Sequence, residues 1–281
     1  MPAAGTRVLI TGAARGIGAG LAERLHERGA RVALLGLEPD LLEQVAARCG
    51  GAHWARCDVR RREDVETAVE DAVAALGGLD VVVANAGVAA QMPIVGGDVE
   101  VMEQTIAVNL MGAYYTLRAA GPHISHERGY ALAIASVAAA VHLPLMGAYS
   151  ASKAAVEALG NTMRIELRPH GARVGVAYFA EIDTDMTSRG FGTEAAARLT
   201  SNLGPFTRVA PLHVALDALE RGIERRSRRI VAPSRAAPLM PFRMLAQRVV
   251  DRFVQRKLAD ALEIARAEHA PLTTPQEEAV G

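Results

Sequence analysis

Along most of the chain, each short apolar run is followed by a stretch in which apolar residues recur at the spacing of a helix. The runs do not alternate between apolar and polar residues, which is typical of strands buried on both faces of a parallel sheet. The pattern predicts strands at Arg7–Thr11, Arg31–Gly36, His53–Asp58, Leu79–Ala84, Tyr130–Ser136, Arg173–Phe179 and Arg229–Ala232. It predicts helices at Gly16–Arg28, Pro39–Arg48, Glu63–Leu76, Val99–Ala120, Tyr149–Arg168 and Leu212–Arg225.

This alternation predicts the fold class. Parallel strands joined by helices need crossover connections, which are almost always right-handed, so the helices cover both faces of the sheet. We therefore expect an α/β protein with a doubly wound, Rossmann-like parallel sheet in a single catalytic domain, residues 1–232. Residues 233–281 are expected to form a helical C-terminal extension. The sequence predicts no secretory signal, and the apolar stretch 130–151 is broken by polar residues and proline, which favours a strand and loop over a membrane span.

Composition narrows the function classes. The chain has 281 residues, with 31 basic and 31 acidic side chains and 50% hydrophobic residues, so a disordered chain or a generally basic nucleic-acid binder is disfavoured. Two cysteines cannot build a disulfide framework, so we expect a reducing cytoplasm. The charge is unevenly placed, because residues 221–257 contain 11 basic and 2 acidic residues. Lysine is rare, and only Lys153 and Lys257 carry it.

A glycine-rich turn joins the first predicted strand to the first predicted helix. The segment 11–18 reads Thr-Gly-Ala-Ala-Arg-Gly-Ile-Gly. Glycines let the backbone approach a pyrophosphate, which then lies at the positive end of the helix dipole. The position of the turn between a strand and a helix favours dinucleotide binding over a merely tight turn.

Three motifs together resemble the short-chain dehydrogenase/reductase family over roughly residues 5–232. They are the glycine turn, Asn85-Ala86-Gly87 after the fourth strand, and Tyr149-Ser-Ala-Ser-Lys153. The resemblance implies an oxidoreductase that transfers a hydride between NAD(H) or NADP(H) and an alcohol or carbonyl group. It also implies a homodimer or homotetramer formed through the helices that carry Asn109 and Tyr149.

The candidate catalytic residues are Asn109, Ser136, Tyr149 and Lys153. Tyr149 and Lys153 are four residues apart, so they share one face of a helix, and a nearby ammonium lowers the pKa of a phenol. The alternatives are a solvated lysine and a serine that satisfies its own turn. The resemblance implies that Ser136 hydrogen-bonds the substrate oxygen and that Asn109 holds a water that connects Lys153 to solvent.

The resemblance also implies the residues that contact the cofactor. Selection between the two dinucleotides should occur after the second strand, where Gly36 and Leu37 replace both the usual NAD-selecting acid and the usual NADP-selecting base. Arg15 favours NADP(H) and Glu38 opposes it, which leaves a slight preference for NADP(H). Phe179-Ala180 departs from the usual Pro-Gly and leaves the local backbone path open. The implied contacts are Gly12, Arg15, Gly16, Ile17, Gly18, Gly36, Asp58, Val59, Asn85, Ala86, Gly87, Tyr149, Lys153, Ile182 and Thr184.

The expected substrate is a small apolar molecule. Residues 137–146 are almost wholly apolar, and residues 187–209, where the family places a substrate lid, contain Phe191, Leu199, Leu203 and Phe206. We expect a steroid, terpenoid, retinoid or fatty alcohol or ketone, although these residues are equally consistent with core packing. His142 could line the pocket or be an ordinary loop residue. No cysteine or histidine spacing indicates a metal site.

Residues 242–257 form a basic amphipathic pattern whose role the sequence leaves open. Such a helix can lie on an anionic membrane surface, cover the substrate cleft or pack on a neighbouring subunit. We therefore expect a cytoplasmic protein, with peripheral membrane contact as one alternative. A non-catalytic NAD(P)-sensing regulator or scaffold is the alternative function. The intact set of Ser136, Tyr149 and Lys153 argues against it, because a sensor needs no acid–base residues.

Overall fold

The computed structural model describes residues 4–184, 186–187, 193–200, 208–268 and 272–273. One sheet of seven parallel strands runs in the order β3-β2-β1-β4-β5-β6-β7. The order reverses between β1 and β4, as a doubly wound sheet requires, and the predicted fold class is confirmed. The strands are β1 (Arg7–Thr11), β2 (Arg31–Gly36), β3 (His53–Arg56), β4 (Val81–Ala84), β5 (Tyr130–Ile134), β6 (Arg173–Phe179) and β7 (Arg229–Ala232).

Two strands end earlier than predicted, and each is followed by a candidate site residue. β3 ends at Arg56 because the chain turns at Asp58, whose carboxylate accepts the backbone N–H of Arg60 at 3.0 Å. β5 ends at Ile134, and the Ser136 hydroxyl accepts the N–H of Ala138 at 3.1 Å at the start of a 3-10 turn. Asp58 and Ser136 therefore lie just beyond the carboxyl ends of their strands, outside the hydrogen-bond ladder of the sheet.

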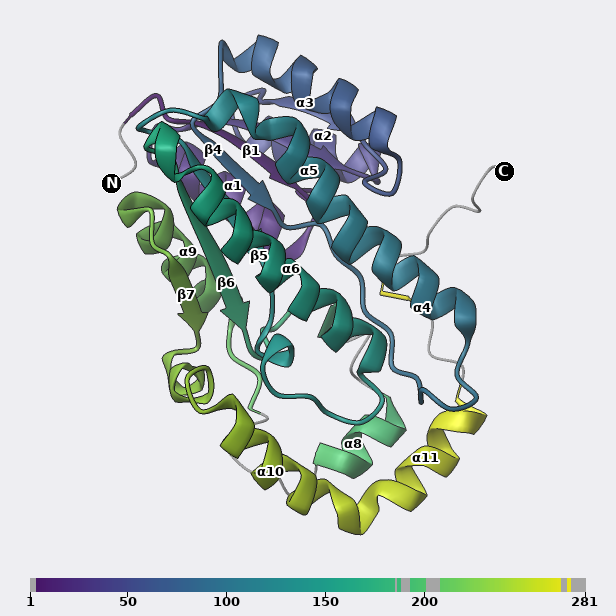
Figure 1. Cartoon of the computed structure of the whole chain (residues 1–281). Coiled ribbons are helices and arrows are strands. Elements are labelled where there is room, and N and C mark those ends of the chain that lie inside the picture. Colours follow the sequence, from purple (N-terminus) through teal and green to yellow (C-terminus); the bar gives the residue numbers. More distant parts are fainter. Residues whose placement is uncertain (1–3, 185, 188–192, 201–207, 269–271, 274–281) are drawn as a thin grey trace.

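Helices cover both faces of the sheet (Figure 1). Apolar residues of α1, α2 and α9 pack on one face, and those of α3, α5 and α6 pack on the other. β1 contributes to both, because Val8 and Ile10 point to one face and Leu9 points to the other. These helices are α1 (Gly16–Glu27), α2 (Pro39–Arg48), α3 (Arg62–Leu76), α5 (Gly112–Ala120), α6 (Gly147–Glu166) and α9 (Leu212–Arg225).

The predicted helix Val99–Ala120 is interrupted. The structure has α4 (Val99–Ile106), a π-helical turn over Ala107–Met111, and then α5. The extra residue of a π-turn changes where the side chains of the helix point, and such turns are frequent at functional sites. Asn109 is the central residue of this turn, and its side chain is almost completely buried.

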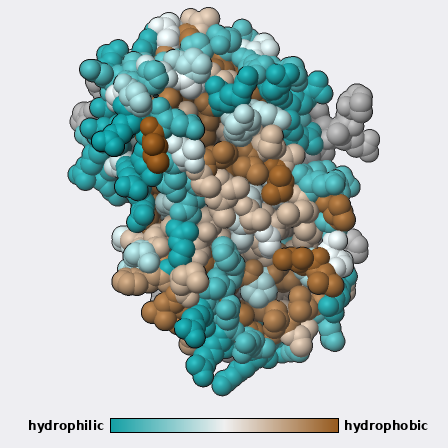
Figure 2. All heavy atoms as spheres, viewed as in Figure 1, coloured by the Kyte–Doolittle hydropathy of each residue, from teal (hydrophilic) through white to brown (hydrophobic). Residues whose placement is uncertain are grey.

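The C-terminal extension packs at the end of the molecule toward which the strands point (Figure 1). It contains α10 (Arg243–Val254) and α11 (Leu258–Ala267), and α11 packs against α8 (Glu194–Thr200). Figure 2 shows apolar side chains gathered over α5 and α6 and again around α8. Within the described residues, no helix is both long and apolar enough to cross a membrane.

Candidate active site

One cavity of about 1180 Å³ opens at the carboxyl ends of the strands. Ser136, Tyr149 and Lys153 line it, and so do residues of the turn between β1 and α1. Among the predicted site residues, Gly18 and Asn109 are not part of the lining that the structure describes. The predicted cofactor contacts that do line it are Gly12, Arg15, Gly16, Ile17, Gly36, Asp58, Val59, Asn85, Ala86, Gly87, Tyr149, Lys153, Ile182 and Thr184.

The turn between β1 and α1 depends on glycine. Gly12 has a φ of 64°, and a Cβ added there would lie 2.8 Å from the Ala86 Cα. A Cβ at Gly18 would lie 2.2 Å from the Gly12 carbonyl oxygen. Arg15 occupies the N-cap of α1, and its side chain, which has no acceptor atom, does not cap the first-turn amides. A close backbone approach and uncapped amides fit the pyrophosphate of a dinucleotide.

Asn85 ties this turn to the end of β4. Its side-chain Nδ2 donates to the carbonyl oxygens of Thr11 at 2.9 Å and Gly12 at 3.1 Å. The Thr11 hydroxyl in turn accepts the backbone N–H groups of Asn85 and Ala86 at 3.1 and 3.2 Å. The two central strands are therefore locked together where the cofactor is expected, and Asn85 acts here by shaping the backbone.

Tyr149 and Ser136 are buried together beside the cavity. Tyr149 is 7% exposed, and burial raises the pKa of its phenol to about 12, while a hydrogen bond with Ser136 acts in the opposite direction. The Ser136 hydroxyl also donates to the Phe179 carbonyl oxygen at 3.1 Å. Because a hydroxyl proton can rotate, the same group can donate to a phenolate or to a substrate oxygen.

Lys153 lies one helical turn from Tyr149 and is 3% exposed. Its Nζ donates to the Ile134 carbonyl oxygen at 2.9 Å and lies 5.7 Å from the centre of the Tyr149 ring. Burial lowers the pKa of Lys153 to about 8. A Cβ on Gly87 would be 3.3 Å from this Nζ, so a side chain at residue 87 would crowd the ammonium group.

Asn109 holds the backbone that follows the Asn-Ala-Gly motif. Its Oδ1 accepts the N–H of Val88 at 2.7 Å, and its Nδ2 donates to the Val88 carbonyl oxygen at 2.9 Å. Nδ2 also donates to the Ser152 hydroxyl at 3.0 Å, on the helix that carries Tyr149. The side chain therefore connects the π-turn, the loop after β4 and α6.

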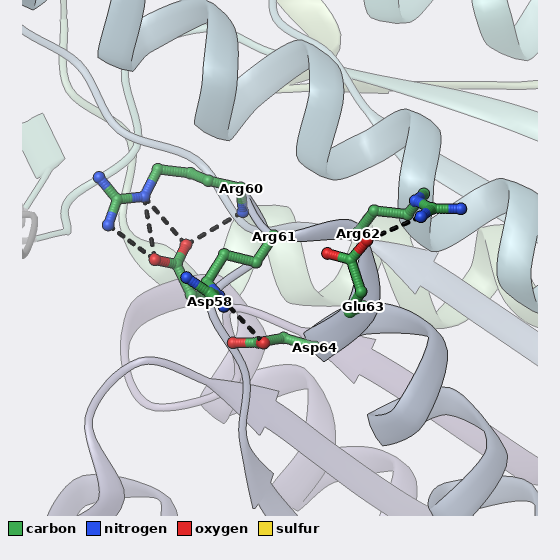
Figure 3. Close-up of polar contacts among 6 residues, drawn as sticks. All are labelled: Asp58, Arg60, Arg61, Arg62, Glu63 and Asp64. Carbon is green, nitrogen blue, oxygen red and sulfur yellow. Dashed lines mark hydrogen bonds and ion pairs between the residues drawn. The ribbon is translucent and has the colours of Figure 1, made fainter. Parts of the chain in front are cut away.

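Two arginines modify the predicted cofactor contacts. Arg15 forms an ion pair with Glu38 at the end of β2, so the residue that favours NADP(H) is held by the residue that opposes it. Figure 3 shows that Arg60 folds back on Asp58. Its Nη2 and Nε donate to the Asp58 carboxylate at 2.6 and 3.0 Å. Burial raises the pKa of Asp58, but the hydrogen bonds and charge of Arg60 outweigh it and hold the pKa below its usual value.

The segment after β6 still lines the cavity, although Phe179-Ala180 departs from the usual Pro-Gly. Phe179 is buried in the core and also lines the cavity. Ile182 and Thr184 line the cavity as expected, and Ile182 forms a bridge with Ala210. Leu199 is buried among α8 and α11. Phe191, Leu203 and Phe206 lie outside the described residues.

Sequence reasoning missed several residues of the cavity wall. Glu181, Thr273 and five apolar residues of α10 line it. The helical spacing of apolar residues in α10 indicates an amphipathic helix but not which surface its apolar face covers. Thr273 carried no signal, because only the folded chain brings its hydroxyl within 3.1 Å of the Ala89 N–H. His142 is exposed, and the described lining does not include it. The described residues contain no cluster suited to a metal ion.

Comparisons with known proteins identify the family of the chain. The family model for short chain dehydrogenases matches residues 6–199. L-fucose dehydrogenase from Oryctolagus cuniculus is 35% identical over 172 residues, which cover 61% of this chain and 61% of that protein. (−)-trans-Carveol dehydrogenase from Rhodococcus erythropolis is 35% identical over 65% of this chain and 73% of its own length. The crystal structure of a dehydrogenase/reductase from Sinorhizobium meliloti 1021 is 28% identical, with a TM-score of 0.70 over 81% of this chain and 93% of that one. The chain belongs to the short-chain dehydrogenase/reductase family.

Proposed function

We propose that the protein is an NAD(P)-dependent oxidoreductase that interconverts an alcohol and a carbonyl group. The observation that carries this proposal is the burial of Ser136, Tyr149 and Lys153 in the lining of one cavity that the glycine turn also lines. A phenol beside an ammonium and a hydroxyl is a set suited to moving one proton at a substrate oxygen. A nicotinamide dinucleotide, when bound, supplies or accepts the hydride.

Each side chain has a separate task in this reaction. Tyr149 donates its proton to the carbonyl oxygen during reduction and takes the alcohol proton during oxidation. Ser136 donates a hydrogen bond to the same oxygen and orients it. The charge of Lys153 stabilises the phenolate, because an opposite charge nearby favours the ionised form. Asn109 fixes the loop at Val88 and the helix at Ser152, which keeps the position of this wall constant.

We propose an apolar substrate such as a steroid, terpenoid, retinoid or fatty alcohol or ketone. Val137, Val141, Leu143 and Met146 line the cavity between Ser136 and Tyr149, which supports this choice. A sugar would leave many hydroxyl groups facing these side chains without partners. Polar side chains also line the cavity, among them Gln91, Glu181 and Arg235, and the Arg235 guanidinium donates to the carbonyl oxygen of Arg208. The name of the carveol dehydrogenase points to a terpenoid alcohol, whereas that of the fucose dehydrogenase points to a sugar.

The remaining proposals concern the cofactor, the assembly and the location. We keep a slight preference for NADP(H) over NAD(H) as the cofactor. Binding of NADP(H) then requires its 2′-phosphate to compete with Glu38 for Arg15. A homodimer or homotetramer through the helices of Asn109 and Tyr149 is supported by the apolar surface over α5 and α6 (Figure 2). A cytoplasmic location and peripheral membrane contact through 242–257 stay predictions. Flotation with anionic vesicles at low salt tests the latter, and an absence of binding would contradict it.

A screen of apolar alcohols and ketones with both cofactors tests the function. We expect Tyr149→Phe to lower turnover by at least about a thousandfold while the cofactor still binds, because the ring remains and the hydroxyl that carries the proton is lost. Tyr114→Phe is a matched control on the surface of α5 and should retain full activity. Full activity of Tyr149→Phe would contradict the assignment. Cofactor binding without turnover of any substrate would favour a sensor or scaffold.

A further inference from the structure

Helix α10 carries an apolar stripe formed by Phe242 at its N-cap and Leu245, Val249 and Phe253 within the helix. These residues are three, four and four positions apart, so they share one face of the helix. Their exposed fractions lie between 48% and 64%, which is high for four large apolar side chains in a row. All four line the cavity that also contains Tyr149. The stripe is therefore the outer part of the wall of the proposed active site.

Polar contacts fix α10 against the catalytic part of the molecule. Arg243 donates to the Glu157 carboxylate at 2.8 and 3.3 Å, and Glu157 belongs to α6, the helix of Tyr149. Gln247 makes a reciprocal pair with His142, because its Oε1 accepts the His142 N–H at 2.7 Å and its Nε2 donates to the His142 carbonyl oxygen at 3.0 Å. His142 lies in the loop between Ser136 and Tyr149. The stripe is thus held at a constant position relative to the catalytic residues.

The other end of α10 is held by an apolar cluster. Val254 packs with Leu145 and with residues of α8 and α11. Leu145 has a φ of 68°, an unfavourable conformation for leucine that the surrounding packing must maintain. The Glu268 carboxylate, just after α11, accepts the first N–H groups of α8 at 3.0 and 3.3 Å. The loop, α8 and the extension therefore form one continuous packed unit around the cavity.

We propose that the stripe is the distal subsite for the substrate and that the enzyme selects alcohols or ketones with a long apolar chain. This inference rests on the proposed function, since it places the reacting carbon at Tyr149 and the remainder of the chain along Val249 and Phe253. A substrate as small as a monosaccharide would leave the stripe in water. A long chain covers it, and each methylene that the stripe removes from water strengthens binding.

A homologous series of 2-alkanols, from about four to about ten carbons, measures this effect. Full burial of a methylene contributes about 0.8 kcal/mol, which is about fourfold in affinity, so one half-exposed wall should give about twofold in kcat/KM per methylene. We expect this increase in the wild-type enzyme. In Val249→Asp and Phe253→Asp it should be lost, with a KM for 2-decanol at least about tenfold higher. The KM for 2-decanol should rise more than the KM for 2-butanol in both variants.

Met244→Asp is the matched control. Met244 is on the same helix and 81% exposed, and it is not among the residues that line the cavity, so this variant should keep the chain-length dependence. An equal dependence in wild type and both stripe variants would overturn the proposal. So would a loss of binding to anionic vesicles in those variants with the dependence intact, since the stripe would then serve a lipid surface.

Direct binding separates this inference from the proposed function. The affinity of cofactor-loaded enzyme for 2-decanone can be measured by calorimetry without any turnover. If the wild type converts no alcohol or ketone, the proposed function fails, and the binding still tests the stripe. Weaker binding by at least about tenfold in Phe253→Asp, with Met244→Asp unchanged, supports the subsite, whereas equal binding in all three proteins overturns it.

Discussion

Replacing Ser136 by alanine should change the pH dependence of alcohol oxidation as well as its rate. Tyr149 is buried, which raises the pKa of its phenol to about 12, and the hydrogen bond with Ser136 lowers it. A hydrogen bond to a charged group contributes about 1.5–3 kcal/mol. Since one pKa unit corresponds to about 1.36 kcal/mol, removal of the hydroxyl should raise the pKa of Tyr149 by about one to two units.

The direction of the effect differs between the two reactions. Oxidation needs the phenolate as a base, so a higher pKa for Tyr149 moves the rise of kcat/KM to higher pH. Reduction needs the phenol, which already predominates below pH 12, so its pH profile near neutrality should keep its shape. The assay follows nicotinamide absorbance in both directions from about pH 6 to about pH 10.5, with Ser136→Thr as a control that retains a hydroxyl. Because this window lies below the pKa of Tyr149, the shift should appear as an oxidation kcat/KM that is about ten- to hundredfold lower at each pH in Ser136→Ala. An unchanged oxidation kcat/KM would mean that Ser136 does not tune Tyr149.

Two further predictions concern the charges of the site. Burial lowers the pKa of Lys153 from 10.5 to about 8, so the unfolded chain binds more protons between these values and this residue's destabilising effect is fully present below pH 8. Lys153→Met should therefore raise the free energy of unfolding of the cofactor-free protein at pH 7 by about 1–3 kcal/mol in urea titrations while abolishing activity, and an unchanged or lower value would contradict the cost of burial. Glu38→Gln removes the carboxylate that pairs with Arg15, so calorimetry should show affinity for NADP⁺ rising about tenfold relative to NAD⁺; a constant ratio would mean that Arg15 does not meet the phosphate.

The sequence predicts the sheet well because its strands are local apolar runs. The same is true of the glycine turn and the Tyr149–Lys153 pair, whose spacing within one segment determines their geometry. The π-turn at Asn109 could not be predicted, since it depends on contacts with Val88 and Ser152, which lie 21 and 43 residues away along the chain. The orientation of α10 is of the same kind, because an amphipathic pattern indicates an apolar face but not the surface that covers it.

The sequence indicates the separate roles of Arg15 and Glu38 but not the ion pair between them. At the sequence level, Arg15 favours binding of a 2′-phosphate and Glu38 opposes it. Their direct contact could not be foreseen, because it joins the first turn to the end of the second strand across the sheet edge. The Arg60 guanidinium on Asp58 is similar, since nothing in a run of three arginines identifies which of them turns back toward the cavity.

The placement of α10 and α11 after β7 has a consequence for biosynthesis. β7 completes the sheet at Ala232, so the glycine turn, Ser136, Tyr149 and Lys153 have all left the ribosome before the C-terminal helices appear. Domains fold during synthesis from the N-terminus onward. The nascent chain can therefore assemble the seven-stranded sheet first and acquire the outer wall of the cavity later, when α10 and α11 emerge. A chain that ended after β7 would keep the sheet and the catalytic residues but would lack the α10 residues that line the cavity.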